Sequence, residues 1–222
     1  MRRILQALCL TVISSPVATA QIIRSPGGSP PIALYTSVGL TYAETIFDGT
    51  TASAWDFGSA LQLRAAVEMS VANGATLGVA YSRASMPMRY SVIGIVPSET
   101  SCTNLTSGYC NASANLSTIT ASFTAGGSYG FHQILNLGVG MSILDDFRED
   151  NTNKALAPLD GDKDFFLAFG YGVGFGISNR LAISIVQDAG VILHQRTGLE
   201  GNRDSYHQLL ITRLGFRLAL GK

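Results

Sequence analysis

Apolar and small residues alternate with a period of two along much of the chain, and Phe165–Ile177 is the clearest case. Large apolar side chains occupy every second position from Phe165 to Ile177, and after Phe166 the positions between them hold only alanine and glycine. A period of two is typical of a strand and not of a helix. The pattern therefore predicts a strand with lipid on its apolar face and the crowded interior of a narrow barrel on the other.

The same alternation recurs along the chain and predicts eight strands in all. They are about Ile32–Glu44, Ala54–Val71, a strand after the Asn73-Gly74 turn, Ser117–Tyr129, Gln133–Leu144, Phe165–Ile177, Leu181–Leu193 and Ser205–Gly221. In Ala54–Val71 the alternation assigns Trp55 and Phe57 to the lipid-facing side and Asp56 to the interior. A tilted strand needs about nine to eleven residues to cross a membrane, and these segments are long enough.

The predicted connections alternate in length. Short turns are expected near Asn73-Gly74, Gly130–His132 and Ser178–Arg180, and longer loops at Thr45–Ser53, Met86–Leu116, Asp145–Lys163 and His194–Asp204, with Pro87, Pro97 and Pro158 in the loops. Short periplasmic turns and long extracellular loops are typical of an outer-membrane barrel. Because the strand number is even, both termini are expected on the periplasmic side.

The N-terminus reads as a secretory signal peptide, Met1–Ala20. Arg2 and Arg3 precede the apolar run Ile4–Ile13, and small residues at 18–20 form a cleavage site before Gln21. The alternative is a membrane-anchoring helix, but the apolar run is too short to span a bilayer. The expected organisation is a signal peptide (1–20), a flexible periplasmic leader (21–31) and an outer-membrane β-barrel domain (32–222).

Charge argues against a nucleic-acid partner. The signal segment holds two of the 15 Lys and Arg residues and none of the 15 Asp and Glu residues, so the remaining chain carries 13 positive and 15 negative side chains. Binding to nucleic acid needs a basic surplus, which this chain lacks. A charged fraction of only 14% favours a chain intended for lipid.

The closing stretch Arg213–Leu220 carries a family resemblance. With the eight-strand pattern, it resembles the small outer-membrane barrels that include the OmpA transmembrane domain and OmpX, whose last strand holds a signal for the barrel assembly machinery. Arg213, Gly215, Leu218 and Leu220 match that signal, but Leu220 replaces the usual aromatic residue and Gly221-Lys222 follow it. The alternative is an ordinary amphipathic strand. The resemblance implies an all-β, eight-stranded antiparallel up-and-down barrel, monomeric, among outer-membrane lipids and lipopolysaccharide.

Cysteine usage predicts one disulfide. Cys102 and Cys110 lie in the longest predicted loop and are the only cysteines after the signal segment. An extracellular location favours oxidation, so a Cys102–Cys110 bridge is expected rather than two free thiols.

Motifs for catalysis or metal binding are weak. Asp160–Asp164 has alternate carboxylates but lacks the later residues of a calcium-binding EF-hand loop, so a solvated acidic loop is expected. His194, Ser205 and His207 cluster near the outer ends of the last two strands, yet their order does not match the deacylases among small barrels. No catalytic role, metal or cofactor is expected.

Several charged and polar residues occupy positions that point inward. They are Asp56, Gln62, Arg64, Glu68, Asp188, Arg213 and Arg217. Charges inside a narrow barrel are tolerated when they are paired, so Asp188 is expected to meet Arg213, and Glu68 to meet Arg217. The alternative is that these charges are hydrated singly in a water-filled passage.

The sequence therefore favours a structural or surface-interaction role: membrane integrity, adhesion, or binding of an extracellular partner by the loops. One alternative is a narrow pore for small solutes. A lipid A-modifying enzyme is a weaker alternative.

Overall fold

The computed structural model describes residues 32–72, 74–95, 99–103, 105, 107–126, 130–178, 180–194 and 206–220. The predicted signal peptide and leader lie outside this part of the chain. Among the described residues there is no helix capable of crossing a membrane. The strands are β1 (Ile32–Ala43), β2 (Ile46–Asp48), β3 (Ser53–Phe57), β4 (Ala60–Ala72), β5 (Ala75–Val92), β6 (Tyr109–Gly126), β7 (Gly130–Glu149), β8 (Asp162–Gly176), β9 (Leu181–Leu193) and β10 (Tyr206–Leu220).

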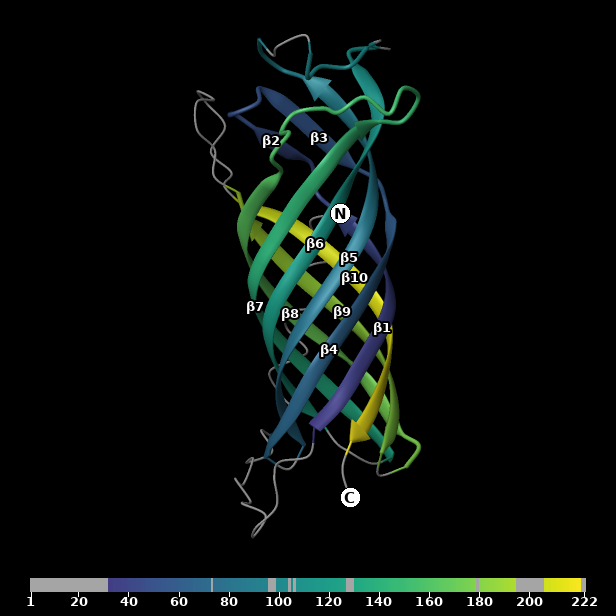
Figure 1. Cartoon of the computed structure of the whole chain (residues 1–222). Coiled ribbons are helices and arrows are strands. Elements are labelled where there is room, and N and C mark those ends of the chain that lie inside the picture. The colour runs from purple at the N-terminus through teal and green to yellow at the C-terminus, as the bar shows by residue number, and fades with distance from the viewer. Residues whose placement is uncertain are drawn as a thin grey trace, which may run out of the picture.

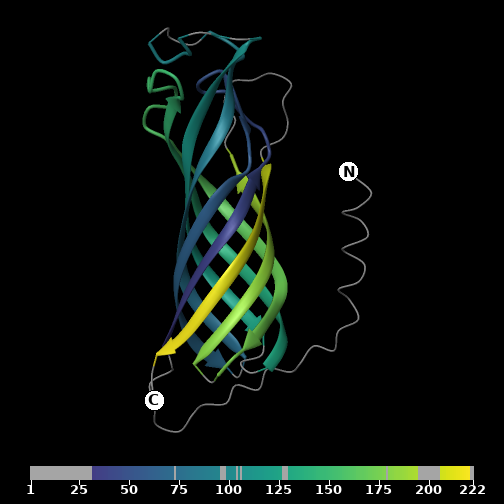
Figure 2. The ribbon, with the colours of Figure 1, turned by 90° about the vertical axis from the view of Figure 1, so that its right-hand side faces the viewer.

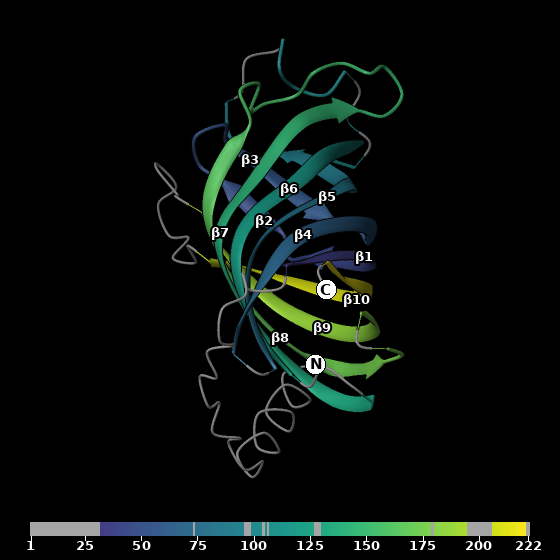
Figure 3. The same cartoon turned by 60° about the horizontal axis from the view of Figure 1, so that its bottom comes forward.

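Eight of these strands close into an antiparallel ring, which confirms the predicted fold class (Figure 1). Each pairs with its neighbour in the chain, the β5–β6 pairing is part of the ring, and β1 pairs with both β4 and β10. In Figure 3, β6, β5, β4, β1, β10, β9 and β8 follow one another around the wall. β1 begins and β10 ends at the end of the barrel opposite the small β2–β3 hairpin; we call these the terminal end and the loop end.

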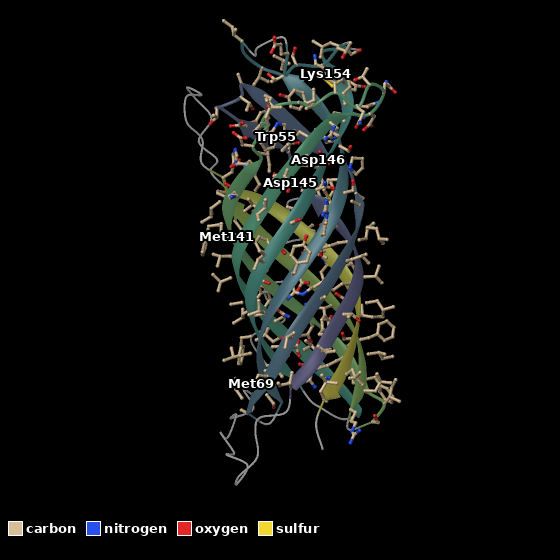
Figure 4. The ribbon with its side chains drawn as sticks, in the orientation of Figure 1. Trp55, Met69, Met141, Asp145, Asp146 and Lys154 are labelled. Carbon is tan, nitrogen blue, oxygen red and sulfur yellow. A yellow bond between two sulfur atoms is a disulfide. The ribbon has the colours of Figure 1, made fainter. Side chains whose placement is uncertain are left out.

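The outer surface of the ring carries a belt of exposed apolar side chains. On β8, Leu167, Phe169 and Val173 are exposed, whereas the intervening Gly170 is buried. Met69 and Met141, labelled in Figure 4, belong to the same belt. Toward the loop end the belt finishes on β8–β10 with a row of paired residues, Phe165, Leu193 and Tyr206. This arrangement is that of a barrel wall in contact with lipid.

Beyond the belt, toward the loop end, the alternation continues, but the apolar side chains now face the interior. On β5, Ala84, Met86, Met88 and Tyr90 are buried inside the barrel and the residues between them are exposed. Here the wall is surrounded by water, so the apolar face turns inward. The predicted loop Met86–Leu116 is therefore wrong: β5 continues to Val92, β6 begins at Tyr109, and the loop between them is residues 93–108.

Pro87 consequently lies inside a strand and not in a loop. It sits where the partner of β5 changes from β4 to β3, since Ala84 is the last residue paired with β4 and Met88 the first paired with β3. Proline lacks an N–H and is tolerated in strands at such interruptions of the ladder. Its carbonyl accepts a hydrogen bond from Gly58 N at 2.7 Å.

The predicted strand Ala54–Val71 is also wrong, because it is two strands. Gly58 and Ser59 interrupt it between β3 and β4. Odd-numbered residues face inward on β3, whereas even-numbered residues face inward on β4. Trp55 and Phe57 are buried and Asp56 is exposed, opposite to the prediction, whereas the predicted faces hold along β4. The predicted loop Thr45–Ser53 contains β2, whose pairing with β3 forms the hairpin at the loop end.

The wall is taller on one side. β5, β6 and β7 extend past the loop-end limits of β1, β8, β9 and β10 (Figure 2). β7 continues to Glu149 and β8 begins at Asp162, so the predicted loop Asp145–Lys163 is shorter than expected. The predicted turn Gly130–His132 is wrong, because all three residues belong to the start of β7. Most of the predicted loop His194–Asp204 lies outside the described residues.

We expect Phe169→Arg to lower the free energy of unfolding by about 2–4 kcal/mol, because it places a charge on the lipid-facing side near the middle of β8. Urea titration of the protein in lipid vesicles measures this. Phe169→Leu is the matched control and should remain close to wild type. An arginine variant as stable as the leucine variant would contradict the assignment of this face to lipid.

Candidate functional site

The terminal half of the barrel interior holds a network of charged side chains. Arg213, on β10, donates from Nε to Asp188 Oδ2 and from Nη2 to Asp188 Oδ1, the latter at 3.1 Å. Its Nη1 donates to the hydroxyl of Tyr35 on β1. Arg213 and Asp188 are 3% and 5% exposed, so this two-pronged ion pair is buried. It joins the three neighbouring strands β9, β10 and β1 on the inner side of the wall.

A second ion pair lies closer to the terminal end. Arg217 Nε donates to Glu68 Oε2 at 3.0 Å, and Thr76 Oγ1 donates to the same oxygen at 3.4 Å. Glu68 is buried and Arg217 is half-buried. The pairs expected from the sequence, Asp188 with Arg213 and Glu68 with Arg217, are therefore in contact.

The other three residues of the predicted network are placed differently. Gln62 is buried and points inward, and its Nε2 has no hydrogen-bond partner. Arg64 also points inward, without an ion-pair partner among the described residues, and its Nε is buried and unbonded. Asp56 does not belong to the network: it is exposed on β3 near the loop end, where it accepts a hydrogen bond from Thr45 Oγ1 at 3.0 Å.

A separate cluster of histidine and aspartate lies inside the barrel just beyond the apolar belt. His194 Nδ1 is 2.8 Å from Asp162 Oδ2 and 3.1 Å from Asp164 Oδ2. Its Nε2 is 3.9 Å from Asp48 Oδ1, which is an ion-pair distance rather than a hydrogen bond. His207 is next to it, with 5.9 Å between the ring centroids. These residues come from β2, β8, β10 and the end of β9.

The sequence placed only part of this cluster together. It predicted the proximity of His194 and His207, but Asp164 is buried rather than part of a solvated acidic loop, and no pattern in the sequence indicates that Asp48 belongs to the cluster. Ser205 lies outside the described residues. Alternation could have identified Asp164 as inward, since it continues the inward series of Phe166 and Gly170 along β8.

Interactions within the cluster strongly shift the pKa values of His194 and Asp48. Burial opposes the charged form of His194, but the carboxylates of Asp162, Asp164 and Asp48 outweigh this and raise the pKa of His194 to about 11. Burial likewise opposes ionisation of Asp48, yet the interactions with His194, the Thr51 hydroxyl and two backbone N–H groups lower the pKa of Asp48 to about 2. At neutral pH the cluster therefore contains an imidazolium ion held by carboxylates.

These shifts predict how stability depends on pH. The raised pKa of His194 stabilises the fold fully below its ordinary pKa of 6.5, and this contribution is lost as the pH rises toward about 11. The lowered pKa of Asp48 stabilises the fold above 3.8, and this contribution is lost as the pH falls toward about 2. We expect the thermal unfolding midpoint to be highest between these two limits and to fall on both sides.

Circular dichroism across the pH range measures that profile, and His194→Gln should flatten its alkaline side. His132→Gln, at the terminal end of β7, is the matched control and should keep the wild-type profile. An alkaline decline of equal size in His194→Gln would show that other groups cause it.

The loop end of the interior is filled by an apolar core. Trp55 is fully buried, with its ring centroid 4.6 Å from that of Phe147 and 5.8 Å from that of His194. The indole Nε1 donates to Ser53 Oγ at 2.8 Å. Met86, Tyr90, Leu116, Leu144, Leu156, Phe166, Ile192 and Leu209 complete this core. It covers the histidine cluster, and Figure 4 places Trp55 inside the wall at this level.

The two longest described connections dock on one another above this core. The predicted Cys102–Cys110 disulfide is confirmed, with an S–S distance of 2.05 Å, and it closes residues 102–110 into a small ring. Thr103 N donates to Glu149 Oε1 at 3.1 Å, and Lys154 Nζ donates to Ser101 O at 2.8 Å. Lys154 is near the upper limit of the wall in Figure 4. The loop end is therefore a cross-linked platform.

The residues of the proposed assembly signal all lie on β10. Arg213 and Gly215 face the interior, and Leu218 and Leu220 face outward at the terminal end. A side chain at Gly215 would have no room, because a Cβ there would be 2.0 Å from the hydroxyl oxygen of Tyr35.

Comparison with known proteins gives structural matches alone. No protein-family model matches the chain, and no curated protein sequence matches it. Among solved structures, it is similar to Neisserial surface protein A, with 11% identity over 84% of this chain and 96% of that one and a TM-score of 0.49. It is also similar to OprG of Pseudomonas aeruginosa, with 12% identity over 87% of this chain and 97% of that one and a TM-score of 0.48.

A third structure is Ail of Yersinia pestis in complex with a heparin analogue, with 12% identity over 86% of this chain and 99% of that one and a TM-score of 0.43. The first of these is a surface protein and the second an outer-membrane protein. The closed ring of eight strands and its apolar outer belt make this protein a small transmembrane β-barrel of the outer-membrane type.

Proposed function

We propose that the protein is a surface-interaction barrel of a bacterial outer membrane, which presents its loop-end platform to an extracellular macromolecule. The observation that carries this proposal is the extended, filled and cross-linked loop end. β5, β6 and β7 continue beyond the lipid belt, and an apolar core fills the space between them. Hydrogen bonds join the two docked connections, and the Cys102–Cys110 disulfide closes a small ring within one of them.

The outer surface of the platform has the character of a contact site. Ile93, Ile95 and Leu105 are exposed in the connection between β5 and β6, and Ile95 has its whole side chain in solvent. Three large apolar side chains exposed on one connection favour contact with another macromolecule. Such a partner would be held mainly by apolar contact, so binding should weaken little with added salt.

The filled interior argues against the two rival functions. A pore needs a continuous passage, whereas here the Arg213–Asp188 pair and the apolar core around Trp55 follow one another along the lumen. A lipid-modifying enzyme needs a nucleophile or base that its substrate reaches. His194 is 2% exposed and lies beneath the apolar core, so the proposal includes no catalytic role.

The test uses the full chain in lipid nanodiscs on a biosensor, against immobilised extracellular matrix proteins and heparin. We expect saturable binding to a matrix protein, reduced at least about tenfold by Ile95→Ser, which corresponds to about 1.4 kcal/mol. Leu159→Ser, an exposed apolar residue of the neighbouring connection, is the matched control. Absence of binding to every surface, together with steady single-channel conductance in planar bilayers, would favour the pore instead.

Orientation is tested separately on intact cells. The proposal places the loop end outside and the termini in the periplasm. Cysteine introduced at Leu159 should react with a large impermeant maleimide on intact cells, whereas cysteine at Ser178, in an exposed turn at the terminal end, should react only after the outer membrane is permeabilised. The reverse pattern would overturn this orientation.

A further inference from the structure

We infer that the lumen of the barrel binds a small oxyanion of phosphate size in a cavity at its terminal end. The cavity has a volume of about 110 Å³ and is lined by Arg64, Arg213, Arg217, Glu68 and Tyr35, together with neutral polar and apolar side chains. At about 30 Å³ per water, this space holds roughly three or four waters, or one phosphate-sized anion in their place.

The charges around this cavity do not balance. Arg213 is engaged by Asp188, and Arg217 by Glu68, which leaves the guanidinium of Arg64 without a carboxylate at ion-pair distance among the described residues. Glu68 is the one acidic side chain among the described residues that line the cavity. Arg64, Arg213 and Arg217 thus face two carboxylates, those of Asp188 and Glu68. This terminal part of the interior therefore carries one surplus positive charge.

This surplus cannot be removed by loss of a proton, because an arginine side chain stays charged in proteins. A charge taken out of water is costly unless it is paired and hydrogen-bonded. The Nε of Arg64 is buried and has no hydrogen-bond partner, so the guanidinium is not fully hydrogen-bonded within the described chain. A bound anion supplies the missing negative charge.

The chemistry around the cavity favours an oxyanion over a halide. The planar guanidinium group presents paired N–H donors that match two oxygens of a phosphate or carboxylate. Asn136 and Thr124, which lie 3.3 Å apart (Nδ2 to Oγ1), add neutral hydrogen-bonding groups to the wall. Because the cavity lies inside the ring and lipid lies outside it, the ligand is an anion from solution and not a lipid headgroup.

The binding test uses the purified, untagged full chain in maltoside micelles, which contain no phosphate. Isothermal titration with inorganic phosphate should show saturable binding, and phosphate should raise the thermal unfolding midpoint more than sodium chloride of equal ionic strength. Arg64→Gln should weaken phosphate binding at least about tenfold, because a charge-assisted hydrogen bond is lost. Arg89→Gln, an exposed arginine near the loop end, is the matched control and should bind as wild type does.

A second measurement tests whether Arg64 is an uncompensated charge or a residue that stabilises the fold. In buffer without phosphate, Arg64→Gln should unfold at a midpoint equal to or above that of wild type, because it removes an uncompensated charge. Arg213→Gln should unfold at a lower midpoint, because it breaks the pair with Asp188. Equal midpoint shifts from phosphate and chloride, unchanged phosphate affinity in Arg64→Gln, or a midpoint lowered as far as in Arg213→Gln would each overturn the inference.

Discussion

Replacing Asp188 by alanine should lower the free energy of unfolding by about 3–5 kcal/mol, because it removes one partner of a buried ion pair and leaves the other uncompensated. Asp188 accepts hydrogen bonds from both Nε and Nη2 of Arg213. Without it, Arg213 and the nearby Arg64 would share the lumen with Glu68 as the remaining carboxylate of the network. Urea titration in lipid vesicles measures the loss.

The reciprocal change should be milder. Arg213→Ala leaves Asp188 without its partner, but the surplus charge of Arg64 remains in the same lumen and offsets part of the loss. The double replacement Asp188→Leu with Arg213→Met is the control, and it should be more stable than Asp188→Ala, since no buried charge is left alone. If Asp188→Ala costs less than about 1 kcal/mol, as exposed ion pairs do, the charges are individually hydrated and the paired network is wrong.

Replacing Trp55 by alanine should lower the free energy of unfolding by about 3–5 kcal/mol, because it leaves a cavity in the apolar core of the loop end. The indole ring is fully buried against Phe147 and His194, and its N–H is bonded to Ser53. Phe175→Ala, on the exposed outer face of β8, is the control and should cost much less. Urea titration in the same vesicles compares the two variants.

Trp55 is the single tryptophan of the chain, so its fluorescence reports its position directly. Emission from the wild-type protein should resist quenching both by acrylamide in water and by lipids with brominated acyl chains. Quenching by the brominated lipids would show that Trp55 faces lipid, as the alternation in the sequence predicts.

Alternation in the sequence was sufficient to determine the strands within the lipid belt and the faces of those strands. On β8 each residue from Phe165 to Gly176 points as predicted, because lipid outside and a crowded lumen inside impose opposite side-chain sizes on the two faces at every step. The predicted strand Leu181–Leu193 is identical with β9. The contacts Asp188–Arg213 and Glu68–Arg217 also followed from inward positions on strands expected to meet.

Alternation alone could not show where the barrel leaves the membrane. An inward apolar residue such as Met86 and an outward apolar residue such as Leu77 belong to the same strand β5, and they differ only in whether water or lipid surrounds the wall at that height. Residues beyond the belt were therefore predicted to form loops. At the short break Gly58-Ser59 the inward-facing positions change from odd-numbered on β3 to even-numbered on β4. Trp55 therefore lies in the core and Asp56 on the surface.

The interior sites depend on tertiary structure because their members are far apart in the chain. Asp48 lies near His194 because the β2–β3 hairpin pairs with β5 at the loop end, and no local pattern encodes that contact. Arg64 points inward by alternation, but the absence of a carboxylate beside it appears only once the ring places Asp188 with Arg213 and Glu68 with Arg217. The sequence by itself determined the barrel wall, through the period of its side chains. Only the tertiary structure showed which inward charge remains unpaired, because that depends on all the strands that surround it.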